Sequence, residues 1–151
     1  MSKTKAKKTE GAKPKVKSKA APKPKTRPNA TSGADFAITF AALKKVLAAF
    51  SERFRVTANE PHKYYLVTQS KSWKGSPMFF GAIMVGKAYV SYHLMPLYTH
   101  PELIKTLSPE LKKRMQGKSC FNFRAPDGAL FAELGTVTQA GLEKYRAKNW
   151  L

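Results

Sequence analysis

The sequence predicts an α+β fold: a mainly antiparallel sheet of about five strands with an N-terminal and a C-terminal helix, preceded by a disordered basic tail. Three observations lead to this fold. Apolar residues recur with the helical period near both ends of the domain, strand-like runs lie between them, and positive charge is concentrated in the first 33 residues. We therefore divide the chain into a tail, residues 1–33, and a folded domain, residues 34–151.

The tail is set apart by its composition. It has ten lysines and one arginine against a single glutamate, a formal charge of +10, whereas the remaining 118 residues carry +9. Four prolines disfavour helix and bias the tail toward an extended polyproline conformation. Large apolar side chains are almost absent, so the tail cannot bury enough surface to offset the entropy lost on ordering. We expect it to be disordered.

The lysines of the tail alternate with other residues, which keeps the linear charge density high. This pattern suits a flexible polyanion such as nucleic acid, because each neutralised phosphate releases counterions. The residues expected to contact phosphates are Lys13, Lys15, Lys17, Lys19, Lys23, Lys25 and Arg27. The alternative is a solubilising tail with no particular partner. Tails rich in Lys, Ala and Pro are similar in composition to those of linker histones and some bacterial nucleoid proteins.

The first element of the domain is predicted to be a helix over about 35–54. Its large apolar residues follow the helical period, mostly in steps of three and four, and should form one face against the sheet. Ser32 or Asp35 is available to cap its start. The apolar face consists of Phe36, Phe40, Leu43, Val46, Leu47, Phe50 and Phe54.

Four strand-like runs follow this helix. They are Arg55–Asn59, Tyr64–Gln69, Met78–Val85 and Ala88–Leu97, the last ended by Pro96. Gly86 and Lys87 join the third run to the fourth, which predicts a hairpin with a two-residue type II′ turn. In that register Val85 lies opposite Ala88, and Gly81 lies opposite Tyr92.

The predicted hairpin has two different faces, because directly opposed residues share a face. One face is apolar and should pack against the first helix. Its residues are Phe79, Ile83, Val85, Val90, Tyr92 and Leu94. The other face is also largely apolar but includes polar groups. Its residues are Phe80, Ala82, Met84, Tyr89, Ser91 and His93.

The last third of the domain is predicted to hold two short helical turns, one strand and one long helix. The turns cover His100–Ile104 and Ser108–Met115, with Ser108 as an N-cap. The strand covers Lys118–Arg124, and a turn at 126–128 leads to a helix over about 129–148. The buried stripe of that helix consists of Leu130, Leu134, Val137, Ala140 or Gly141, and Tyr145.

The second sheet face is the candidate ligand pocket. Cys120, Asn122 and Arg124 share one face of their strand, and we expect this face to coincide with that of Ser91 and His93. A guanidinium and hydrogen-bonding groups on an apolar floor suit a small anion or carboxylate. Trp73, from the loop 70–76, would close over it. The alternative is that these groups satisfy one another or cap the last helix.

Other chemistry finds little support in the sequence. Cys120 with His93 would be the thiol and base of a nucleophilic site, but no acid is phased to orient the imidazole. The three histidines lack metal-ligand spacing and acids are sparse, so we predict neither a metal site nor a cofactor. Gly117-Lys118-Ser119 lacks the glycine that a phosphate-binding loop needs at the position of Lys112. We predict no catalytic residue and therefore no enzyme.

The environment of the protein follows from its cysteine count and hydropathy. A single cysteine provides no internal disulfide, and no apolar run approaches the ~20 residues that span a bilayer. No apolar stretch follows the basic N-terminus as in a secretory signal. We expect a cytoplasmic protein, with nucleoid association as the finer alternative, and no membrane partner. A basic surface patch of Lys112, Lys113, Arg114 and Lys118 would either cooperate with the tail or be a solvated helix face.

Residues 36–151 resemble the uncharacterised YdhG-like domain family of mostly bacterial proteins. The resemblance lies in KSWKGSPMFFGAIMVGKAYVSYHLMP, in SPELKKRMQGKSCFNF and in ELGTVTQAGLEKYRAKNW. It implies a compact α+β domain with an antiparallel sheet, and some members are proposed to handle iron in a frataxin-like way. Two functions are therefore expected: non-specific binding of nucleic acid or another polyanion through the tail, or a domain that handles a small ligand or metal and has an incidental tail.

Overall fold

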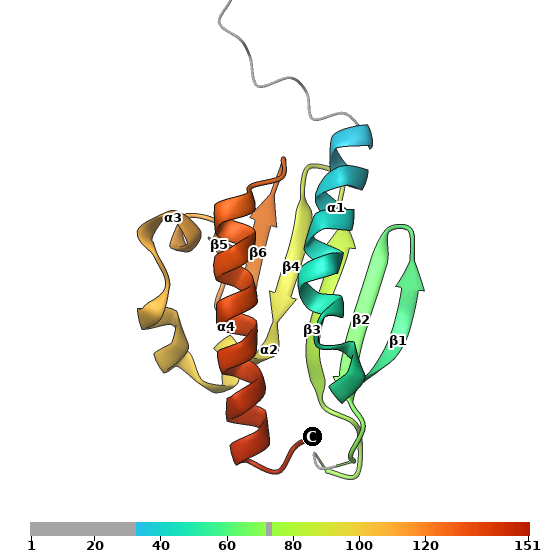
Figure 1. Cartoon of the computed structure of the whole chain (residues 1–151), viewed down its shortest axis with the longest axis vertical. Coiled ribbons are helices and arrows are strands. Elements are labelled where there is room, and N and C mark those ends of the chain that lie inside the picture. Colours follow the sequence, from blue (N-terminus) through green and yellow to red (C-terminus); the bar gives the residue numbers. More distant parts are fainter. Residues whose placement is uncertain (1–32, 72–73) are drawn as a thin grey trace, which may run out of the picture.

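The computed structural model describes residues 33–71 and 74–151. In these residues two long helices, α1 (Gly33–Ala48) and α4 (Gly128–Ala147), lie side by side across one face of a six-stranded antiparallel sheet (Figure 1). The predicted α+β class, the antiparallel sheet and the two terminal helices are confirmed. The predicted disorder of the tail falls on residues outside the described ranges, apart from Gly33, which is the first residue of α1.

The strands lie in the order β1-β2-β3-β4-β6-β5 within the sheet. Their bounds are Phe54–Glu60, Lys63–Thr68, Phe79–Val85, Val90–Leu94, Met115–Gln116 and Cys120–Phe123, numbered along the chain. Each pairs antiparallel with its neighbours. β5 was not predicted, because Met115 was assigned to the end of a helical turn and Gln116 to no element. Between the long elements lie η1 (Ser51–Arg53), α2 (Met95–Thr99), η2 (Pro101–Thr106) and α3 (Pro109–Lys112).

The first helix is shorter than predicted. α1 ends at Ala48, and a tight 3-10 turn over Ser51–Arg53 leads directly into β1. Phe54, expected on the helix, is instead the first residue of β1, where its ring stacks on that of Phe80 with centroids 4.0 Å apart. The helical spacing of Phe54 was therefore coincidental, and the prediction was wrong at this end. Asp35 lies in the first turn of α1 rather than at its cap.

The β3–β4 hairpin has a longer loop than predicted. Val85 pairs with Val90 and Gly81 with Leu94, so four residues, 86–89, form the connection instead of two. The glycines with positive φ in the described chain do not include Gly86, so the type II′ assignment was wrong. The Gly86 N–H donates to the Tyr89 carbonyl at 2.8 Å. The register differs by two residues, an even number, and the faces of β4 are therefore those expected.

A β-bulge in β3 exchanges the faces of two phenylalanines. Leu66 pairs with Gly81 but Val67 pairs with Phe79, which leaves Phe80 as the extra residue. Phe80 is fully buried and meets Tyr145 of α4 edge-on at 5.2 Å. Phe79 is displaced to the other face, where its ring lies 5.7 Å from that of Tyr65. The predicted faces of Phe79 and Phe80 were wrong because alternation does not continue through a bulge.

The remaining predictions of secondary structure differ from the structure mainly at element ends. β4 stops at Leu94, and Pro96 lies in the first turn of α2 rather than after a strand. The Ser108 side chain caps α3 as predicted, accepting from the Leu111 N–H at 3.1 Å. Asp127 caps α4, and the predicted stripe of α4 is buried except for Ala140, which is partly exposed.

Candidate functional site

The predicted polar cluster is assembled on the sheet face that points away from α1 and α4. β4 and β6 pair so that Ser91 lies opposite Asn122 and His93 lies opposite Cys120. The side-chain faces of the two strands therefore coincide, as the sequence predicted. Ser91 is 7% exposed, and the other three side chains are half-buried.

The members of this cluster contact one another. The Cys120 Sγ lies 3.7 Å from the His93 Nε2 and 3.5 Å from the Asn122 Oδ1. The Asn122 amide donates to the Gln116 Oε1 at 2.7 Å. Within the described residues, every buried side-chain nitrogen and oxygen has a hydrogen-bond partner. The alternative in which these polar groups satisfy one another is thus consistent with the geometry.

Burial keeps both titratable members of the cluster neutral. It lowers the pKa of His93, and it raises the pKa of Cys120 against a smaller opposing effect of the Ser91 hydrogen bond. A cysteine nucleophile needs the thiolate, commonly paired with a protonated imidazole. Here the neutral thiol and the neutral imidazole are the favoured forms near pH 7.

Histidines and acids are dispersed. His62 lies 3.3 Å from Glu60 in the exposed turn between β1 and β2, and His100 is buried with its Nδ1 2.9 Å from the Thr99 hydroxyl. No three of the described His, Cys, Asp and Glu residues gather closely enough to hold a metal ion.

Of the other predicted pocket residues, Arg124 does not join the Cys120–His93 cluster, and Trp73 lies outside the described residues. Arg124 follows β6 directly, is exposed, and lines a separate hollow of about 270 Å³ beside the β5–β6 edge. We call this the basic hollow. It is lined by Tyr89, Lys113, Arg114, Met115, Gln116, Asn122 and Arg124.

The basic hollow has three cations and no acid in its lining. The ion pairs among residues 33–71 and 74–151 involve none of Lys113, Arg114 and Arg124. Their charge is thus available to an anion. The sequence had placed Lys113 and Arg114 in a basic patch and Arg124 in the ligand pocket, and the structure brings the three together. Lys112 and Lys118 are not in the lining, and the Lys118 ammonium lies 5.9 Å from the Tyr98 ring.

The sequence could not identify this hollow, because it depends on the short strand β5. Met115 and Gln116 pair with Phe121 and Cys120, which holds the end of α3 against the edge of β6. Gly117 has a φ of +73°, a conformation that glycine adopts without strain, and it turns the chain between β5 and β6. The glycine is the one local feature of the sequence that marks this hairpin.

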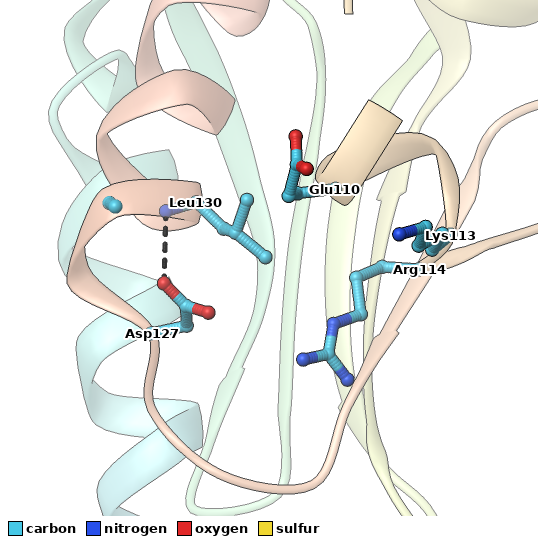
Figure 2. A pocket seen from close by; sticks show the side chains of 6 residues that line it. Glu110, Lys113, Arg114, Asp127 and Leu130 are labelled. Atoms are coloured by element: carbon cyan, nitrogen blue, oxygen red, sulfur yellow. Dashed lines mark hydrogen bonds between the residues drawn. The ribbon is translucent and has the colours of Figure 1, made fainter. Parts of the chain in front are cut away.

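A second hollow of about 430 Å³ lies between α3 and the start of α4 (Figure 2). Its charged residues are Glu110, Lys113, Arg114 and Asp127, so two acids balance two cations. The Asp127 carboxylate accepts from the Leu130 N–H at 3.2 Å, a capping role. Lys113 and Arg114 line both hollows. The basic hollow is the one with unbalanced charge.

The basic hollow and the start of the domain lie at the same end of the molecule. Val85, Val90 and Phe123 pair side by side, so the 86–89 loop and Arg124 leave the sheet at one end. Gly33, the first residue of α1, and Gly128, the first of α4, lie at this end too (Figure 1). The tail therefore joins the domain at the end that carries the basic hollow.

These features define the class of protein: a small α+β domain with two helices on one sheet face, a polar cluster on the other, and a basic hollow at the end where a lysine-rich segment joins. Comparison of the chain with protein-family models, with curated proteins and with solved structures found no match. Among the described helices, none has the length and hydropathy needed to cross a bilayer.

Proposed function

We propose that this protein is not an enzyme and binds nucleic acid or another polyanion without sequence specificity, through its tail, with the basic hollow as a second contact. One observation carries the proposal: residues 1–33 hold a formal charge of +10, slightly more than the 118 residues that follow. Counterion release makes such a density sufficient for binding.

The arrangement of the domain supports a shared ligand. The tail joins at the end where Lys113, Arg114 and Arg124 lie without ion-pair partners among the described residues. A nucleic acid held by the tail would therefore pass close to these three cations. The neutral forms of Cys120 and His93 support the non-enzymatic part of the proposal.

Binding by the tail should be nearly blind to sequence. The tail has one arginine and no aromatic residue, so it lacks the groups that read base edges or stack on bases. If about six of its cations contact phosphates, the affinity for duplex DNA should fall with the logarithm of salt at a slope of roughly −5.

The test compares two full-length variants that each remove three positive charges. One replaces Lys13, Lys15 and Lys17 by Gln. The matched control replaces three exposed domain lysines, Lys45, Lys105 and Lys148, which lie outside the basic hollow. Fluorescence anisotropy with a random-sequence duplex is measured from 50 to 300 mM salt. We expect the tail variant to lose roughly 2 to 3 from the slope and the control much less. Equal losses would contradict the proposal.

A second candidate function rests on the cluster of Ser91, His93, Cys120 and Asn122, which the fold brings together on one sheet face. In this alternative the chain is a YdhG-like domain that handles a small ligand or metal, and the tail is incidental. Native mass spectrometry of the purified full chain tests it. A bound mass that disappears in His93→Gln, a cluster residue outside the basic hollow, and remains in Lys13→Gln would favour this function over polyanion binding.

A further inference from the structure

We infer that the basic hollow is a nucleotide subsite, which gives the domain a preference for single-stranded over duplex nucleic acid. This inference rests on the proposed function, since it assigns a strand type to the polyanion. The groups that carry it are the cations Lys113, Arg114 and Arg124, the Tyr89 ring, and the Gln116 and Asn122 amides, all in the lining of one hollow.

The three cations provide a phosphate site. They come from the end of α3, from the residue before β5 and from the residue after β6, so they approach the hollow from two sides. Arg114 also lines the hollow that contains Asp127 and Glu110 (Figure 2). The negative charge of those two carboxylates reduces the attraction of Arg114 for a phosphate in the basic hollow. Lys113 lines both hollows too. Arg124 does not line the hollow between α3 and α4, which makes it the principal phosphate ligand, and its planar fork matches two phosphate oxygens.

Tyr89 provides an aromatic surface in the same hollow. Tyr89 is half-buried and directly precedes β4. Partial burial restricts a side chain before a ligand binds, which lowers the entropy that stacking would cost. Stacking on an aromatic ring needs a base whose face is free, and bases in a duplex present only their edges.

The two amides complete a site for one base. The Asn122 amide donates to Gln116 at 2.7 Å, which leaves the two amide hydrogens of Gln116 for a ligand. Gln116 is exposed and lies at the edge of the sheet. The volume of about 270 Å³ is close to the lower limit of typical small-ligand pockets, about 300 Å³, and much smaller than a duplex.

A duplex would use this end of the molecule differently. Its phosphates could contact the tail and the exposed cations, but its stacked bases could not reach Tyr89. The subsite therefore adds affinity for single strands alone, on top of a tail contribution that both forms share.

The experiment uses the full chain with two probes of equal length, a 20-nucleotide thymidine single strand and a 20-base-pair duplex, at 200 mM salt. The decisive variant is Tyr89→Ser. We expect it to lower single-strand affinity about 5- to 100-fold, the usual effect of removing one stacking ring, and to change duplex affinity less than twofold. Tyr89→Phe, which retains the ring, should bind as the wild type does, and photocross-linking of the wild-type chain tests the subsite even if Tyr89→Ser fails to fold.

Tyr98→Ser is the matched control. Tyr98 is 59% exposed and also has a cation near its ring, Lys118, but it lies outside the hollow. We expect less than a twofold effect on either probe. Photocross-linking with 5-iododeoxyuridine in the single strand should label Tyr89.

Three results would overturn the subsite: equal effects of Tyr89→Ser and Tyr98→Ser, equal losses for single strand and duplex, or a cross-link that excludes the hollow. If any of these occurs while the Lys13, Lys15 and Lys17 variant still loses its salt slope, the proposed function stands and the subsite alone is wrong. If neither probe binds the wild-type chain, both are wrong.

Discussion

Among the described glycines, Gly141 leaves the least room for a side chain, and its replacement by alanine should destabilise the fold. It lies within α4 and is buried against Pro96 of α2. A Cβ built on Gly141 would lie 2.6 Å from the Pro96 Cβ and 2.7 Å from its Cγ. Favourable carbon–carbon contacts lie at ~3.5–4.0 Å, so the two helices would have to separate by about 1 Å. The pyrrolidine ring is rigid and cannot rotate away.

The size of the effect follows from two opposing contributions. In an exposed helix interior, replacing Gly by Ala stabilises by about 1 kcal/mol. Overpacking a well-packed core typically costs about 1–3 kcal/mol. Gly135, six residues earlier on the same helix, provides the control, because its built Cβ meets nothing closer than Val46 Cγ1 at 3.8 Å. We therefore expect Gly135→Ala to be more stable than the wild type, and Gly141→Ala to be about 1–3 kcal/mol less stable than Gly135→Ala.

The measurement is urea unfolding of the two full-length variants, followed by circular dichroism, with thermal melts in parallel. For a domain of this size we expect the melting temperatures of the two variants to differ by about 4–12 °C. A Gly141→Ala protein as stable as Gly135→Ala would refute the reasoning, since it would mean that α2 moves aside at no cost.

Two further predictions concern stability. Glu133 accepts from both the N–H and the hydroxyl of Ser108, at 2.6 and 2.7 Å, so Glu133→Ala should cost about 1–3 kcal/mol in urea unfolding, whereas Glu143→Ala, which removes an exposed ion pair, should cost under about 1 kcal/mol. The lowered pKa of His93 should remove stability as the pH falls below about 6.5, and the raised pKa of Cys120 should remove it as the pH rises above about 8.5. Melts of His93→Gln and Cys120→Ala should each flatten one side of that profile, and unchanged profiles would contradict the assignment.

Periodicity was enough to predict the helices and their buried stripes, but not where a helix gives way to a strand. Phe50 and Phe54 are four residues apart, which fits a helix, yet the chain turns at Ser51–Arg53 and uses Phe54 in the sheet. That exchange depends on the Phe80 ring, which lies 26 residues further along the chain. Local spacing contains no information about such a partner.

The polar cluster could be predicted and the basic hollow could not, for a related reason. Ser91, His93, Cys120 and Asn122 lie on strands whose alternation fixes their faces, and the error in hairpin register was an even number of residues. The bulge at Phe80 lies in an apolar run with no distinguishing side chains, so alternation gave the wrong face there. The basic hollow depends on the pairing of a two-residue strand, which is too short to leave a periodic pattern.

The proposed division of work between tail and domain explains why a small, shallow subsite would be sufficient. Once the tail has bound a strand, the hollow meets that strand as part of the same complex, at an effective concentration that depends on the length of the connection. A subsite too weak to act alone would then change the overall affinity measurably. The tail would determine the salt dependence, because it contributes most of the phosphate contacts. The hollow would determine the preference for strand type, since Tyr89 gives it the aromatic ring that the tail lacks. Neutralising the tail and removing the Tyr89 ring should therefore alter two separate properties of the same complex.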